Sequence, residues 1–298
     1  MLLHISGVHG VEAYAGSATQ LALLAAPPPL NAGTALVLVH VLNPWGMAWL
    51  RRCNEANVDL NRNFLDDNAT WSGCPPLYRC IEALLNPPSP PARDGFVLRL
   101  GLRGLRHGVA ALRQAIAHGQ YRYPQGLFYG GDQLQPGPRL LMSWLRDHLA
   151  TTNTLFVIDM HTGLGPQGAS TLITEAHVGC GPASASLSQR LGLPVLGDPA
   201  APEAYAVRGS LGAALPRLLP NLGLDFVLQE IGTATPLRVL HALREENRWH
   251  HHGGGGIDHP SKQALLAALC PADAEWRRAA VRQGCELAHR AAAALQSP

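Results

Sequence analysis

The stretch Ala35-Leu36-Val37-Leu38-Val39-His40-Val41-Leu42 is the clearest strand in the sequence. Apart from His40 it is apolar throughout, and a run without polar alternation predicts a strand that is covered on both faces. Shorter runs of this kind occupy residues 2–5, 155–161 and 224–230. Helical patterns separate the runs, which predicts an α/β fold with a mixed, mostly parallel sheet and helices on both faces. We expect these helices at residues 13–26, 140–149, 184–191, 210–219, 236–248 and 272–295.

The composition excludes several classes of function. The chain has 298 residues, of which 47% are hydrophobic, and a net charge of +2. Its basic residues are scattered, so neither a nucleic acid nor a membrane surface is an expected partner. The six cysteines form no C-x-x-C pair, and we expect free thiols. No basic segment precedes an apolar one at the N-terminus, so we expect a cytoplasmic protein without a signal peptide.

Residues 65–100 interrupt the alternation of strands and helices. Six prolines in this stretch predict a Pro-rich, irregular surface excursion. Strands of the same sheet are expected on both sides of it, so we interpret residues 1–298 as a single domain. Beyond the excursion, five apolar residues at helical spacing predict one amphipathic helix, namely Leu102, Leu105, Val109, Leu112 and Ile116. An aromatic, glycine-rich loop follows at residues 121–131.

The first candidate site residues follow the first strand. His9 and Glu12 are separated by one helical turn, just after the Ser6-Gly7 break. Side chains at i and i+3 leave the same face of a turn, so this pair can chelate a divalent ion. A surface ion pair would have the same spacing, and this motif alone leaves both interpretations open.

Two further strands end in residues of the same kind. The run at 155–161 ends in His161, with Asp159 on the same strand face, and the run at 224–230 ends in Glu230. The carboxyl ends of parallel strands form the usual ligand-binding edge of an open α/β sheet. Two histidines and one carboxylate form the three-ligand set of a catalytic zinc site, and a further carboxylate nearby can act as general base on water.

A polar loop at residues 51–64 contains a further candidate site. Asp59, Asn61 and Asn63 alternate around Arg62, in a segment with little periodicity. One interpretation is an Asx-rich turn. The other is a binding loop, because the guanidinium fork of arginine matches a carboxylate. The residues alone do not separate the two.

Five ordered motifs between about Leu2 and Gly253 resemble the zinc carboxypeptidases, and most closely a bacterial branch known only as a domain of unknown function. The motifs are Ser6-Gly7-Val8-His9-Gly10-Val11-Glu12, Asn43-Pro44-x-Gly46, Val58-Asp59-Leu60-Asn61-Arg62-Asn63-Phe64, Asp159-Met160-His161-Thr162-Gly163 and Glu230-x-Gly232-Thr233. The resemblance implies a carboxypeptidase-like fold. It also implies one zinc ion per chain, bound by His9, Glu12 and His161.

The resemblance also assigns roles around the metal. It implies that Asn61 and Arg62 bind the terminal carboxylate of the substrate and that Glu230 is general base and then general acid. A family arginine polarises the scissile carbonyl, and both Arg51 and Arg52 fit it; we prefer Arg52. A family tyrosine closes over the substrate four residues before a glycine, which points to Tyr205. We further expect Asp159 to orient His161.

One departure from the family concerns the N-terminus. Family members have several dozen residues before the first motif, including edge strands, whereas this chain starts almost on the first ligand strand. We therefore expect an N-terminally short domain that exposes the edge of the Ala35–Leu42 strand. A long apolar edge without charges favours self-association.

The expected function is a zinc-dependent, carboxypeptidase-like hydrolase that cleaves an amide bond next to a free carboxylate. An alternative is an N-acyl amino acid deacylase, because the aspartoacylase and succinylglutamate desuccinylase relatives share His-x-x-Glu and Asp-Leu-Asn-Arg. A second alternative is a zinc-binding protein without catalysis, resulting from the short N-terminus. The expected partner is thus a peptide or an acyl amino acid.

Overall fold

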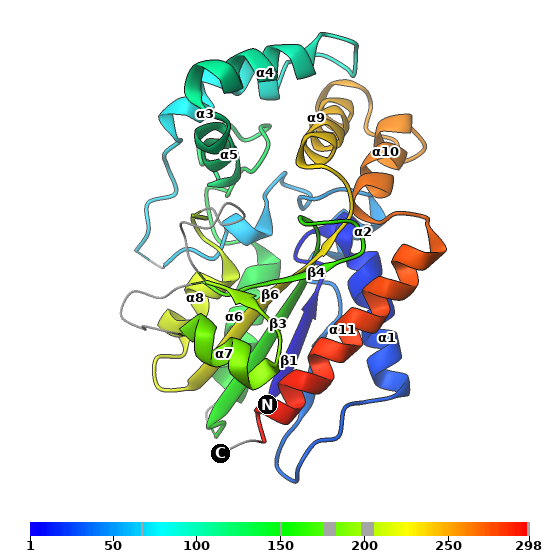
Figure 1. Ribbon diagram of the computed structural model, residues 1–298. Coiled ribbons are helices and arrows are strands. Elements are labelled where there is room, and N and C mark those ends of the chain that lie inside the picture. The colour runs from blue at the N-terminus through cyan, green and yellow to red at the C-terminus, as the bar shows by residue number, and fades with distance from the viewer. Residues whose placement is uncertain (67, 150, 176–182, 198–205, 297–298) are drawn as a thin grey trace.

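A computed structural model of the chain has a central six-stranded sheet (Figure 1). It describes every residue except 67, 150, 176–182, 198–205 and 297–298. The strand order is β2-β1-β3-β6-β4-β5. The strands are β1 (Leu2–Ser6), β2 (Leu36–Val39), β3 (Thr154–Gly163), β4 (Ser170–Ile173), β5 (Val195–Leu196) and β6 (Gly223–Gly232).

The sheet is mixed and mostly parallel, which confirms the predicted fold class. β2, β1, β3 and β6 run parallel, whereas β4 pairs antiparallel with β6 and parallel with β5. Side chains alternate between the two faces, and each face packs on helices. One face packs on α1 (Ala13–Ala25), α7 (Ala183–Leu191) and α11 (Ala274–Ala294), and the other packs on α6 (Pro136–His148) and α8 (Leu211–Leu218).

The remaining helices lie beyond the carboxyl ends of β1, β3 and β6, in the upper part of Figure 1. They form the layer beneath which the candidate site lies. The helices are α2 (Pro44–Ala48), α3 (Pro76–Leu85), α4 (Phe96–His107), α5 (Val109–Ala117), α9 (Pro236–His252) and α10 (Pro260–Leu269), with the short 3₁₀ turns η1 (Gly10–Glu12) and η2 (Leu60–Arg62). None of the helices in the described part of the chain is long and apolar enough to cross a membrane. The single domain over residues 1–298 stays a prediction.

The prediction that residues 65–100 are irregular is wrong. This excursion contains α3 and the start of α4, and proline starts α3 because its fixed φ suits the first helical turn. Its apolar residues form a small core of their own with α5, comprising Tyr78, Ile81, Leu84, Leu85, Phe96, Leu112 and Ile116. The prolines therefore delimit helices here and do not exclude them.

The single amphipathic helix predicted around residues 102–116 is also wrong. α4 ends at His107 and α5 begins at Val109, because Gly108 has a positive φ of 84° that an α-helix does not accept. The apolar spacing across this break is coincidental. Leu105, for example, is 86% exposed.

β2 is shorter and less covered than its sequence predicts. It spans only Leu36–Val39, and all four side chains are half-buried because β2 lies at one edge of the sheet. Val41, two residues beyond the strand, has a φ of 61°, which does not continue an extended strand. An apolar groove runs along this edge and is lined in part by Val37, Val39 and Trp144. Self-association through this edge stays a prediction.

Candidate active site

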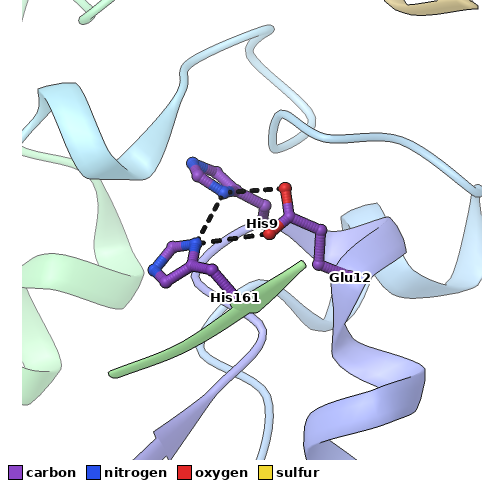
Figure 2. Close-up of side chains that lie close together, drawn as sticks. All are labelled: His9, Glu12 and His161. Atoms are coloured by element: carbon purple, nitrogen blue, oxygen red, sulfur yellow. Dashed lines mark hydrogen bonds and ion pairs between the residues drawn. The ribbon is translucent and has the colours of Figure 1, made fainter. Parts of the chain in front are cut away.

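Three side chains from two segments meet at the carboxyl end of the sheet. His9 and Glu12 come from the turn after β1, and His161 comes from β3; all three are buried. Nδ1 of His9 lies 3.0 Å from Oε1 of Glu12 and 3.1 Å from Nδ1 of His161, which is 3.3 Å from Oε2 of Glu12. Figure 2 shows the three side chains pointing toward one another.

The backbone around η1 explains why the ligand pair follows β1 so closely. Gly7 turns the chain out of the strand with a φ of 65°, a conformation that favours glycine. Gly10 packs against α2 so closely that a Cβ would lie 2.1 Å from the carbonyl carbon of Gly46. The N–H groups of Gly10 and Val11 donate to the carbonyls of Arg52 and Arg51, respectively. The ligand turn is therefore fixed to the segment that carries the two arginines.

The donor set and its spacing fit a metal ion. In a tetrahedral zinc site with ligands at about 2.0–2.1 Å, neighbouring ligand atoms are about 3.3 Å apart. The potential ligand atoms of His9, Glu12 and His161 lie within 4.8 Å of one another, and three of their contacts measure 3.0–3.3 Å. Two imidazole nitrogens and a carboxylate are ligands that zinc prefers.

Each histidine has a carboxylate on its other ring nitrogen. Nε2 of His9 donates to Oδ1 of Asp59 at 2.9 Å, which leaves the Nδ1 lone pair toward Glu12. Nε2 of His161 lies 2.8 Å from Oδ2 of Asp159, close enough for an ion pair although the alignment is not that of a hydrogen bond. Carboxylates in these positions orient metal-binding imidazoles and make them more basic.

The charges in this cluster favour a divalent cation. Glu12, Asp59 and Asp159 contribute three negative charges and Arg52 one positive charge, so neutral imidazoles leave a net charge of −2. Burial opposes ionisation of Glu12, but His9, His161 and Arg52 outweigh it and hold the Glu12 pKa below its usual value. Burial would likewise lower the His161 pKa, but Asp159 and Glu12 raise it well above the usual value.

Glu230 is a separate carboxylate beside this cluster. It lies on β6 directly opposite His161 in the β3–β6 register, and its side chain is buried. Oε2 accepts a hydrogen bond from the backbone N–H of Leu164 at 3.3 Å. Burial, reinforced by Glu12, raises the Glu230 pKa to about 7. Such a group can exchange a proton near neutral pH.

The structure separates the two neighbouring arginines. Arg52 is only 16% exposed and faces the cluster, where Nη1 donates to Oε1 of Glu12 and Nε to Oδ2 of Asp59, both at 3.0 Å. Arg51 points to α9 instead, where Nε donates to Glu246 at 2.9 Å. Of the two candidates for the carbonyl-polarising residue, only Arg52 therefore lies at the cluster.

Asn61 and Arg62 lie on η2 and are both buried. Oδ1 of Asn61 accepts from the N–H of Leu211 at the start of α8. Three N–H groups of Arg62 donate to the carbonyls of Ala117 and Asn61, so within the described residues two of its five N–H groups are left for a ligand. Gly119 makes room for this side chain, because a Cβ there would lie 2.7 Å from Cδ of Arg62.

The remaining predicted residue, Tyr205, lies outside the described residues. The sequence analysis missed the contact of Asp59 with His9, because fifty positions separate the two residues. It also missed Glu175, which lies next to β4 on the face that carries Glu230 and accepts a hydrogen bond from Oγ of Ser210. Burial raises the pKa of Glu175. Neither the Asp59–His9 contact nor the place of Glu175 could be identified from spacing along the chain.

Comparison with protein-family models identifies the family of this chain. The family described as "Protein of unknown function (DUF2817)" matches residues 1–283. The chain belongs to this family. The expected membership in a family known only as a domain of unknown function is thereby confirmed. No curated protein matches the DUF2817 chain.

Among solved structures, the DUF2817 chain is similar to the murein-tripeptide amidase MpaA from Escherichia coli O157, with 18% identity and a TM-score of 0.44 over 83% of this chain and 81% of that chain. It is also similar to bovine thrombin-activatable fibrinolysis inhibitor in complex with tick carboxypeptidase inhibitor. The identity is 10% and the TM-score 0.44, over 95% of this chain and 81% of that chain. A succinylglutamate desuccinylase from Silicibacter sp. TM1040 has 14% identity and a TM-score of 0.38, over 85% of this chain and 56% of that chain. At these values the likeness is distant.

Proposed function

We propose that this protein is a zinc-dependent hydrolase that cleaves an amide bond next to a free carboxylate, in the manner of a carboxypeptidase. The observation that carries the proposal is the convergence of His9, Glu12 and His161 with a second carboxylate, Glu230, beside them. A structural cluster would not need an additional buried carboxylate with a raised pKa. A hydrolase needs one, because water must lose a proton as it attacks.

His9, Glu12 and His161 would hold the metal, with Asp59 and Asp159 orienting the two imidazoles. Bound there, a zinc ion supplies Lewis acidity, which lowers the pKa of water and polarises a carbonyl oxygen. With neutral imidazoles, the net charge of −2 without the ion favours the binding of a dication.

Glu230 would act as general base and then as general acid. As a carboxylate it accepts a proton from the attacking water, and as a carboxylic acid it returns that proton to the leaving amine. Its burial favours the neutral form, so the carboxylate is a stronger base than one in water. The hydrogen bond from Leu164 fixes one of its oxygens.

Arg52 and Arg62 would bind the substrate on the two sides of its terminal residue, at the scissile carbonyl and at the terminal carboxylate. Arg52, held by Glu12 and Asp59, would stabilise the oxygen of the scissile carbonyl as negative charge develops on it. Arg62 would bind the terminal carboxylate with its two remaining N–H groups, beside Asn61. A peptide and an N-acyl amino acid share this arrangement, because in both the leaving amine carries the free carboxylate.

A substrate panel with zinc-loaded protein tests this proposal. We expect release of a free amino acid from peptides or from N-acyl amino acids, and little turnover of the matching C-terminal amides. Arg62→Lys should raise KM for the carboxylate substrates, because lysine lacks the bidentate fork. Arg278→Lys, an exposed position on α11, is the matched control.

The panel also separates the alternatives. Cleavage of acyl amino acids but not of peptides would assign the deacylase activity. No hydrolysis of any member by protein that contains one zinc ion would contradict the proposal and favour a zinc-binding protein without catalysis.

A further inference from the structure

The aromatic loop, defined here as residues 119–131, is bonded directly to the η2 segment. The N–H of Asp59 donates to the carbonyl of Tyr129 at 2.8 Å, and Nδ2 of Asn63 donates to the carbonyl of Gly130 at 2.8 Å. These contacts flank η2, which carries Asn61 and Arg62. The loop therefore supports the segment that carries Asn61 and Arg62, although the proposed function assigns no role to any loop residue.

Phe128 in this loop has an unfavourable backbone conformation. Its φ is 56°, in the left-handed region, which is unfavourable for an L-residue and which glycine adopts freely. The N–H of Gln120 donates to its carbonyl at 3.0 Å and fixes this conformation. Such strain persists only where surrounding contacts hold the residue in place.

The ring of Phe128 contacts both site arginines. The guanidinium carbon of Arg52 lies 5.4 Å from the ring centroid, and that of Arg62 lies 5.7 Å from it. Both distances are within the range of cation–π interactions. The ring is half-buried and also packs against the small core of α3 and α5, so its own position is fixed.

We propose that Phe128 is a positioning residue that sets the spacing between Arg52 and Arg62. This inference rests on the proposed function, in which one arginine acts at the scissile carbonyl and the other at the terminal carboxylate. A fixed distance between two cations selects substrates with one residue between these groups.

Nuclear magnetic resonance of the arginine side chains tests the contact without any substrate. The Nε–Hε resonances of Arg52 and Arg62 are assigned with Arg52→Lys and Arg62→Lys. We expect both resonances to move in Phe128→Leu, which has the same strained φ without a ring, and to stay in place in Phe128→Tyr. Phe128→Met is the second ring-free variant if the leucine variant does not fold. Tyr123→Leu, which removes a ring near Arg122 in the same loop, is the matched control.

Kinetics then test the role. Phe128→Leu should lower kcat/KM for free-carboxylate substrates by roughly 5- to 30-fold, mainly through KM, because a desolvated cation–π contact contributes about 1–2 kcal/mol. Phe128→Tyr should restore it. Unmoved arginine resonances in Phe128→Leu, or an unchanged KM in a folded ring-free variant, would overturn the inference. If the wild-type protein cleaves no substrate, the proposed function fails, while the resonances still decide whether the ring positions the arginines.

Discussion

Two buried clusters of charged groups lie side by side in this protein, and each contains one of two consecutive arginines. The α9 cluster consists of Arg51, Glu246 and Lys262, and the metal cluster consists of His9, Glu12, Asp59, Asp159, His161 and Arg52. In the α9 cluster donors meet acceptors: Oε1 of Glu246 accepts from Arg51 at 2.9 Å and from Lys262 at 2.6 Å. In the metal cluster the Nδ1 atoms of His9 and His161 are 3.1 Å apart, and in neutral imidazoles whose Nε2 atoms carry the proton both are acceptors.

The difference shows how a buried binding site is distinguished from a buried structural ion pair. Taking charged groups out of water is costly, and the cost is offset only if opposite charges and hydrogen-bond donors are present. The α9 cluster provides them through Glu246, and Asn57 and Asn247 are further acceptors for Arg51. Among the described residues, only Nη1 of Arg51 in this cluster has no hydrogen-bond partner. The metal cluster has a net charge of −2 and two lone pairs directed at one point. It is complete only with a cation.

The largest expected effect separates catalysis from metal binding. Glu230→Gln should lower kcat by roughly 100- to 10,000-fold, because the amide cannot accept the proton of water. The variant should still bind one zinc ion, since Glu230 is not among the converging ligands. Steady-state kinetics and metal analysis check this, with Glu275→Gln on the exposed start of α11 as control. A kcat within a factor of two of the wild type would remove Glu230 from the mechanism.

A second change affects the α9 cluster alone. Glu246→Gln leaves Arg51 and Lys262 buried without their carboxylate, which should lower the free energy of unfolding by roughly 3–5 kcal/mol. Zinc stoichiometry and kcat of the folded fraction should stay unchanged. Urea unfolding measures the stability, with Glu286→Gln, an exposed residue of α11, as control. Loss of zinc binding in folded Glu246→Gln would show that the two clusters do not act separately.

A third test compares the two carboxylates behind the histidines. Asp59→Asn and Asp159→Asn should each weaken zinc binding roughly 10- to 100-fold, because the imidazoles lose the group that orients them. The exposed Asp147 on α6 provides the control variant Asp147→Asn. Competition with a chelator gives the affinities. Equal affinity in wild type and in both variants would mean that the carboxylates do not support the ligands.

The smallest effect is a pH dependence of the metal-free protein. Burial raises the Glu230 pKa from 4.5 to about 7, so the folded chain binds this proton more tightly than the unfolded chain does. The stabilisation is therefore complete below pH 4.5 and is lost as the pH rises to about 7. In chelator-treated samples, the melting temperature of Glu230→Gln should increase relative to wild type over this range. A constant difference between pH 4.5 and 8 would contradict the raised pKa.

The sequence predicts the ends of the strands better than it predicts what lies between them. The fold class and the strands that end near Glu12, His161 and Glu230 are visible because buried parallel strands are continuous apolar runs with polar ends. The helical layer was mispredicted, since apolar spacing does not reveal that Gly108 separates two helices. α10 was missed as well, although the carbonyl of Leu269 at its end accepts from the hydroxyl of Thr162 beside the ligands.

Contacts between distant segments account for the rest of what sequence analysis did not find. Asp59 and His9 are fifty positions apart, and no periodicity joins a loop residue to a turn residue. Lys262 is the only lysine of the chain and is buried. Nothing in the sequence around it predicts a place in a buried cluster. Arg51 and Arg52 are indistinguishable as residue types, and only the fold directs one to α9 and the other to the metal ligands.

The zinc content of the purified protein tests the central claim most directly. Elemental mass spectrometry should find about one zinc ion per chain in wild type and in His289→Ala, which changes an exposed residue of α11. His161→Ala should lose the ion and remain folded, because a three-ligand site does not retain zinc with two ligands. Wild-type protein that stays metal-free after incubation with zinc, or a His161→Ala variant with one tightly bound zinc ion, would contradict the account.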